Sequence, residues 1–144
     1  MSGHRLDAAG FRALMHRLAD AWQSHDTEAG VACFTGDAVY IEPPDAQLVQ
    51  GHAELHAYFE DVSHSTIMRW HNLWFDEEAQ TGAGEFTFGD SNEPLADHGV
   101  CVVRLRDGLI EHWREYFTRG PRDHDEFVAV EGKQWQWRPE SSEG

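Results

Sequence analysis

Residues 36–44, GDAVYIEPP, have the pattern of a β-strand that ends on an acidic residue. The apolar and aromatic residues favour a strand, and the two prolines after Glu42 stop further strand pairing. Side chains alternate between the two faces of a strand, so Tyr40 and Glu42 should point the same way. A phenol and a carboxylate are therefore expected to share one wall of the fold.

The second half of the chain has the pattern of a four-strand meander. Residues 98–106 and 109–117, HGVCVVRLR and LIEHWREYF, are joined by Asp107-Gly108, a strong signal for a two-residue hairpin. Two further strands are expected at residues 67–75 and 81–89, and an irregular loop at 91–97. Alternation along the last strand places three side chains on one face: Trp113, Glu115 and Phe117.

Three helices are expected before the meander. Asp7 can cap the first, in which apolar residues recur at helical spacing at Phe11, Leu14, Met15, Leu18 and Trp22. Asp26 can cap a short second helix that ends at Gly36. A third is expected from about Gly51 to Val62, with a buried face formed by Leu55, Tyr58, Phe59 and Val62.

Composition indicates one folded domain and excludes some partners. The chain has 144 residues, 40% hydrophobic and 12% aromatic, which is enough for a substantial core. The net charge of −15 argues against binding to nucleic acid or anionic membranes. No apolar run approaches membrane-spanning length and the N-terminal residues lack signal-peptide features, so we expect a cytoplasmic protein. Cys33 and Cys101 do not indicate a disulfide framework.

The order of elements predicts an α+β domain. Three helices, with a short strand before the third, precede the meander, which favours a strongly bent antiparallel sheet around a long helix. Such a sheet tends to leave an apolar cavity at one end. We expect a single domain over residues 1–144, with a core at about 6–120 and a C-terminal extension at 121–144. Within that extension, the QWQW segment at 134–137 could fold back on the body.

This order, with GDAVYIEPP, GHAEL at 51–55 and DGLIEHWREYF at 107–117, resembles the nuclear transport factor 2-like superfamily. The SnoaL-like and ketosteroid-isomerase-like branch is the most similar. The resemblance implies a cone-shaped α+β barrel, with three N-terminal helices packed in a curved antiparallel sheet that encloses a pocket. It also implies a homodimer. The superfamily includes isomerases, cyclases, dehydratases, epoxide hydrolases and non-catalytic binding domains, so the fold does not define the chemistry.

The same resemblance suggests site residues. Glu42 takes the place of the general-base Asp of steroid isomerases. Tyr40 and Glu115 take the places of a Tyr and an Asp that hold water in limonene epoxide hydrolases, and His71 weakly matches a strand His of scytalone dehydratase. Two positions depart from the isomerase pattern, since its oxyanion Tyr and that residue's acidic partner correspond to Leu18 and Cys101.

Through the resemblance, Glu42 and Glu115 should both face the cavity. A carboxylate buried against aromatic rings has a raised pKa, and two neighbouring carboxylates push their pKa values apart. We therefore expect Glu42 to act as a base, Glu115 as an acid or water-holder, and Tyr40 as a hydrogen-bond donor. The expected ligand-binding residues are Leu18, Trp22, Phe59, Trp74, Cys101 and Trp113.

Two functions remain open at this stage. One is a cofactor-independent acid/base enzyme, of isomerase, cyclase, dehydratase or epoxide hydrolase type, that acts on a small, largely apolar molecule. The other is a non-catalytic domain for ligand binding or association. His52 and His56 have a spacing that can hold a metal ion, but the apolar residues of that helix take its buried face. We therefore expect a solvated histidine pair and no metal or cofactor.

Overall fold

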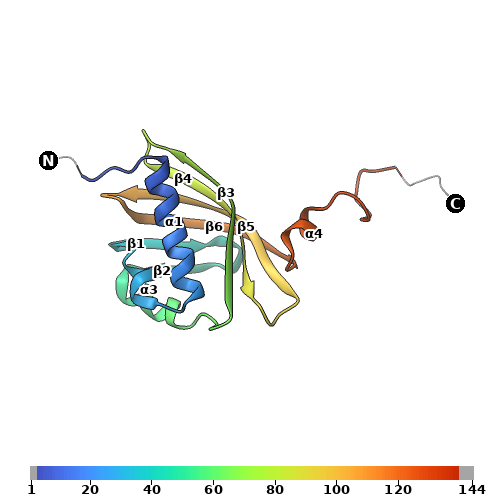
Figure 1. Cartoon of the computed structure of the whole chain (residues 1–144), viewed down its shortest axis with the longest axis horizontal. Coiled ribbons are helices and arrows are strands. Elements are labelled where there is room, and N and C mark those ends of the chain that lie inside the picture. The colour runs from blue at the N-terminus through green and yellow to red at the C-terminus, as the bar shows by residue number, and fades with distance from the viewer. Residues whose placement is uncertain (1–2, 140–144) are drawn as a thin grey trace.

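The structure, a computed structural model, describes residues 3–139 and has the expected α+β architecture. A curved, open six-stranded sheet is accompanied by four α-helices in this part of the chain (Figure 1). The helices are α1 (Ala8–Gln23), α2 (Thr27–Val31), α3 (Gly51–Glu60) and α4 (His124–Val128). The strands are β1 (Phe34–Glu42), β2 (Gln47–Gln50), β3 (Thr66–Asp76), β4 (Thr81–Asp90), β5 (Leu95–Arg106) and β6 (Leu109–Pro121). A 3-10 turn, η1 (Pro43–Asp45), joins β1 to β2.

The sheet is mixed, and this corrects the expectation of a wholly antiparallel sheet. The strand order is β2-β1-β6-β5-β4-β3, and the meander from β3 to β6 is antiparallel as expected. β1 instead runs parallel to β6. Parallel neighbours need a long connection, and here α3 and the first three strands of the meander lie between them in sequence. This pairing brings GDAVYIEPP beside HWREYF.

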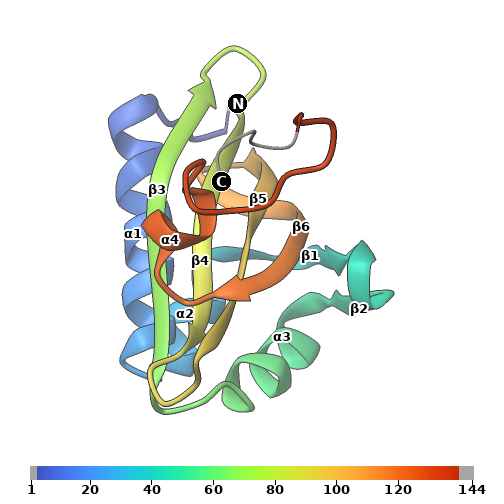
Figure 2. The same cartoon turned by 90° about the vertical axis from the view of Figure 1, so that its right-hand side faces the viewer.

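The long helix α1 packs its apolar face against the sheet, mainly at β3 (Figure 2). The face of the sheet toward α1 and α3 is called the inner face below. Asp7 caps α1 as predicted, because its carboxylate accepts a hydrogen bond of 2.7 Å from the backbone N–H of Gly10. The buried residues of α1, β1, α3 and the meander form one cluster, so a single core supports the site.

Several local predictions were wrong at element ends. The second helix is capped by Asp26 as expected, but it ends at Val31, and Gly36 lies within β1. The stretch expected to be an irregular loop, residues 91–97, already enters β5 at Leu95. The hairpin at Asp107-Gly108 is confirmed, since both residues have positive φ, 55° and 78°, as a type I′ turn requires.

The C-terminal extension contains one short helix and then an exposed segment. α4 lies over the outer face of the sheet (Figure 2), where His124 and Phe127 contact side chains of β3 and β5. Trp137 is 99% exposed and Trp135 45%, so QWQW does not pack onto the body. The rest of the predicted extension, 140–144, lies outside the described residues. Within 3–139, no helix has the length and apolar character needed to cross a membrane.

Candidate active site

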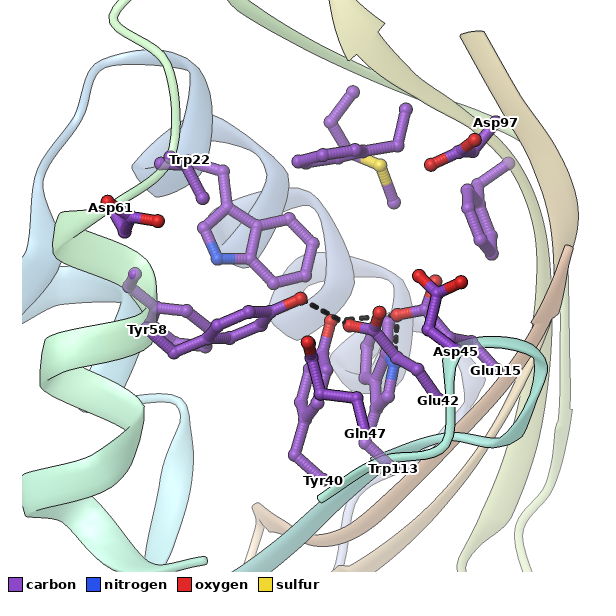
Figure 3. Close-up of a pocket in the computed structure, with 15 residues that line it drawn as sticks. Trp22, Tyr40, Glu42, Asp45, Gln47, Tyr58, Asp61, Asp97, Trp113 and Glu115 are labelled. Carbon is purple, nitrogen blue, oxygen red and sulfur yellow. Dashed lines mark hydrogen bonds between the residues drawn. The ribbon is translucent and has the colours of Figure 1, made fainter. Parts of the chain in front are cut away.

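A cavity of about 200 Å³ lies on the inner face, between α3 and the curved sheet (Figure 3). Pockets for drug-sized ligands range from about 300 to 1,000 Å³, so this one suits a smaller molecule. Its aromatic walls are Trp22, Tyr40, Tyr58, Phe59, Phe86, Phe88 and Trp113. Five carboxylates line it as well, from Glu42, Asp45, Asp61, Asp97 and Glu115. The remaining lining residues are Gln47, Val62 and Met68.

β1 directs Tyr40 and Glu42 to this cavity, as the alternation of GDAVYIEPP predicts. Tyr40 is 4% exposed and Glu42 is 6% exposed. The parallel register places Tyr40 opposite Trp113 of β6, and the two rings stack at 5.4 Å between centroids with an interplanar angle of 4°. The aromatic floor beneath the carboxylates is thus assembled from two strands that are distant in sequence.

Glu115 is held on this floor by two hydrogen bonds. Its Oε1 accepts a hydrogen bond of 2.8 Å from the hydroxyl of Tyr40 and one of 3.0 Å from the indole N–H of Trp113 (Figure 3). Glu115 is 8% exposed, and no group within residues 3–139 donates a hydrogen bond to its other oxygen, Oε2. The site therefore holds a buried carboxylate whose one oxygen is available to a ligand.

Glu42 is held from the helical side of the cavity. Its Oε2 accepts a hydrogen bond of 2.5 Å from the hydroxyl of Tyr58 on α3. The helical periodicity of residues 51–62 indicates that Tyr58 is buried, but sequence reasoning did not identify it as a site residue. That contact depends on how the end of α3 is placed relative to β1, and the helical pattern alone does not predict this placement.

Both carboxylates are harder to ionise than in water, as expected for buried acids. Burial raises the pKa of Glu115 to about 7, and the charge of Glu42 adds to the effect against the hydrogen bonds from Tyr40 and Trp113. Burial also raises the pKa of Glu42, while the hydrogen bond from Tyr58 opposes that rise. Near neutral pH the pair can therefore hold one proton between them.

Acidic groups missed by the sequence analysis surround the pair. Burial raises the pKa of Asp97, whose Oδ1 lies 3.4 Å from the Nε of Arg119. Asp45 comes from η1, and Asp61 directly follows α3; both are exposed at the rim. Asp97 belongs to the stretch that was expected to be a loop, and only its pairing in β5 turns it inward.

The expected ligand-binding residues divide into two groups. Trp22, Phe59 and Trp113 line the cavity. The indole N–H of Trp22 is buried and has no acceptor in the described part of the chain, and the ring itself forms part of the cavity wall.

The other three expected ligand-binding residues lie elsewhere. Leu18 and Cys101 are fully buried behind the cavity wall, and Trp74 is 54% exposed on the outer face. Cys101 pairs with Glu115 in the β5–β6 register, and burial together with the charge of Glu115 raises the pKa of its thiol. Both cysteines are free and buried.

His71 is not brought to the carboxylates. Met68 and Trp70 face the core, so alternation along β3 leaves His71 on the outer face. Its Nε2 lies 2.7 Å from the hydroxyl of Thr87, and its ring stacks on His124 at 3.5 Å between centroids. The expectation for His71 came from the resemblance, and the position of the side chain contradicts it.

The histidine pair on α3 turns to separate partners. His52 Nε2 lies 2.8 Å from the carbonyl oxygen of Phe34, and His56 Nε2 lies 2.8 Å from the carboxylate of Glu28. Across residues 3–139, no three His, Cys, Asp or Glu side chains are grouped so that they could bind a metal ion.

Comparison with known proteins places this architecture in a family. A family model described as a SnoaL-like domain matches residues 15–113. No sequence among curated proteins matches the chain.

Three solved structures illustrate the fold. A protein of unknown function with a cystatin-like fold from Methylobium petroleophilum is similar at a TM-score of 0.72 and 20% identity, over 83% of this chain and 82% of that one. A candidate ketosteroid isomerase from Kribbella flavida is similar at a TM-score of 0.68 and 18% identity, over 85% of this chain and 90% of that one. A limonene-epoxide-hydrolase-like epoxide hydrolase from Mycobacterium tuberculosis is similar at a TM-score of 0.62 and 19% identity, over 77% of this chain and 84% of that one. At these identities, the likeness establishes the fold.

Proposed function

The chain belongs to the SnoaL-like domain family, and from that premise we propose a cofactor-independent acid/base enzyme that acts on a small, largely apolar molecule. One observation carries the proposal: two buried carboxylates, Glu42 and Glu115, are each held by a phenol and line one cavity. Catalytic carboxyl groups commonly have pKa values moved toward the working pH by burial and by a charged neighbour. Both causes act on Glu115.

In the proposed reaction, the two carboxylates divide the work. Glu42, in its charged form, removes a proton from the ligand or from a water molecule beside it. Glu115, with a pKa of about 7, is partly protonated at neutral pH and gives a proton to the atom that becomes negative. Isomerisation, cyclisation, dehydration and epoxide opening each need one such acceptor and one such donor.

Neighbouring donors hold both carboxyl groups. Tyr40 and Trp113 donate to Glu115, Tyr58 donates to Glu42, and the hydroxyl of Tyr40 also favours the charged form of Glu42. Since no Arg, Lys or His lines the cavity among the described residues, protonated Glu115 would stabilise the developing charge.

Turnover assays on a panel of isomerisable enones and epoxides test the proposal. Glu42→Gln keeps the size of the side chain but removes the base, so it should lower kcat by about 10²- to 10⁴-fold. Glu85→Gln is the matched control, since Glu85 lies on the outer face in β4, where Asn72 donates to it. Wild-type rates in Glu42→Gln would refute the proposal. Ligand binding without turnover in either protein would instead identify a binding domain.

We also propose that two copies associate through the outer face of the sheet. Trp74, Val100 and Tyr116 are exposed there by 54%, 38% and 49%, and Val100 is paired with Tyr116 across β5 and β6. Exposed apolar side chains that form a contiguous patch often mark an interface between proteins. Sedimentation velocity should give a dimer for the wild type and a monomer for Trp74→Lys with Val100→Lys. A monomeric wild type at micromolar concentration would contradict the proposal.

A further inference from the structure

The cavity combines aromatic walls with an unusual balance of charge. Of the side chains that line it, five are carboxylates and none in the described part of the chain is Arg, Lys or His. Arg119 reaches one of them, Asp97, at 3.4 Å, and Arg119 itself does not line the cavity. A ligand that enters this space therefore meets aromatic rings and negative charge, which a positive side chain balances at Asp97 alone among the described lining residues.

One of the two buried glutamates has an oxygen that is open to a ligand. Glu115 is 8% exposed and lines the cavity, and its Oε2 has no donor within residues 3–139. Because this oxygen faces the cavity, its hydrogen-bonding partner is whatever fills that space, water or a ligand. A purely hydrocarbon ligand would remove water from this oxygen and supply nothing in return.

Mutual repulsion among the carboxylates indicates what the partner should be. The charge of Glu42 acts on Glu115, and those of Asp45 and Asp97 act on Glu42, each disfavouring the ionised form of its neighbour. A neutral donor would satisfy one oxygen but leave this repulsion in place. A positive charge would do both, and aromatic rings are favourable surroundings for an organic cation.

We propose that the natural ligand of this cavity is a small organic cation, a protonated amine or a quaternary ammonium compound with a short hydrocarbon part. The space of about 200 Å³ is several times the roughly 30 Å³ that a water molecule occupies in the liquid, which is adequate for such a molecule. The net charge of −15 adds a long-range attraction for cations.

This inference rests on the proposed function, for which it names the substrate class. A positive ligand separates the duties of the two glutamates, because one can pair with the cationic nitrogen while the other handles the proton. It also refines the expectation of a largely apolar substrate: the hydrocarbon part contacts Trp22, Phe59 and Trp113, and the charge contacts the carboxylates.

Three probes that share a benzyl group test the inference: benzylammonium, benzyl alcohol as its neutral match in size, and the larger benzyltrimethylammonium. Binding to the full chain at pH 8 is followed by NMR through the indole N–H signals of Trp22 and Trp113. Both cations should bind at least tenfold more tightly than the alcohol. In a Glu42→Gln, Glu115→Gln double variant, the preference should fall to near equality while the affinity for the alcohol changes about twofold or less. Glu85→Gln should keep the full preference.

Three results would overturn the inference. These are equal or tighter binding of benzyl alcohol, a preference for cations that survives the double substitution, and no perturbation by either cation at millimolar concentration. The binding assay needs no turnover, so it fails independently of the proposed reaction. A cation-selective cavity in a protein whose Glu42→Gln variant is fully active would keep this inference and remove the reaction. An enzyme dependent on Glu42 that prefers the alcohol would do the reverse.

Discussion

The two faces of the sheet each carry a cluster of titratable side chains, with imidazoles on the outer face and carboxylates on the inner face. On the outer face, His98 is 3% exposed, with Nδ1 2.8 Å from the hydroxyl of Thr87 and Nε2 2.6 Å from the carbonyl oxygen of Pro121. His71 shares Thr87 and stacks on His124 of α4. On the inner face, Glu115 keeps one oxygen free beside a cavity.

This contrast separates a structural cluster from a functional one. The outer imidazoles are held by the sheet and covered by α4, which Phe127 also anchors by stacking on His98. Their arrangement attaches the C-terminal extension to the sheet. The inner carboxylates carry a cost of burial that their own hydrogen bonds do not remove, and such costs are typical of sites that act on a ligand. The two clusters therefore differ in what they contact: the imidazoles contact α4, and the carboxylates line the cavity of the proposed site.

The largest expected difference between the two faces is in turnover. Glu115→Gln removes a transferable proton from the inner face and should lower kcat by about 10²-fold or more. His71→Gln removes an imidazole from the outer face and should change kcat less than about threefold. Steady-state assays of both variants with the same substrate make the comparison. Equal losses in the two variants would mean that the outer cluster also takes part in the chemistry.

The next difference concerns stability. The pKa of Glu115 is about 7 in the folded protein and near its ordinary value of 4.5 when unfolded, so the folded state binds more protons between these values. Folding stability should therefore fall as the pH rises from about 4.5 to 7, by about 3 kcal/mol from this group. Glu115→Gln carries no charge, so it should be about 2 kcal/mol more stable than the wild type at pH 8.

Urea denaturation at pH 4 and pH 8 measures this effect. At pH 4 the gain should nearly vanish, because Glu115 is then protonated in both states. Glu85→Gln, on the outer face, should show no gain that depends on pH. A Glu115→Gln variant that is less stable than the wild type at pH 8 would mean that the buried carboxylate contributes to the fold.

A smaller effect tests the hydrogen bonds that tune the pair. The hydroxyl of Tyr40 favours the charged form of Glu115, so Tyr40→Phe should raise the pKa of Glu115 above 7 by about one unit. The limb of the pH–rate profile that reports Glu115 should move in the same direction. Tyr116→Phe is the control, since Tyr116 lies in the same strand as Glu115 but is 49% exposed, and it should leave the profile unchanged. If this limb does not move in Tyr40→Phe, it reports the titration of a group other than Glu115.

The smallest effect is expected on the outer face. Burial and the neighbouring His124 lower the pKa of His71, so the folded state resists its protonation. Packing of α4 should therefore be stable above the ordinary His value of 6.5 and weaken as the pH falls below it. His124→Ala should cost about 1 kcal/mol and speed amide exchange in α4 alone. Faster exchange in β1 would contradict this local role.

The sequence allowed the inner face to be predicted more fully than the outer face. Strand alternation placed Tyr40 with Glu42 and Trp113 with Glu115, because a period of two survives in any sheet. It could not show that β1 lies parallel to β6, which is what brings Tyr40 to Glu115. The resemblance to a family implied that both side chains face one cavity, but the parallel pairing was not predicted, because which strands become neighbours depends on the whole chain.

Three other residues were placed wrongly or were not identified from the sequence. His71 was selected by resemblance, whereas alternation with Met68 and Trp70, which face the core, leaves it on the outer face. Tyr58 was expected to be buried, but its partner Glu42 is supplied by a different element. Asp97 lies in a polar stretch, SNEPLAD, that resembles a loop until pairing with β4 extends β5 to include it.

The most direct test of this account is a pH titration of the glutamate carboxyl carbons by NMR, with Glu42→Gln and Glu115→Gln for assignment. The account predicts a pKa of about 7 for Glu115 and a value above the ordinary 4.5 for Glu42. It also predicts that the Glu42→Gln variant lowers the pKa of Glu115, because a negative neighbour is lost. Values at or below 4.5 for both groups would show solvated, stably charged carboxylates and would contradict an acid/base pair.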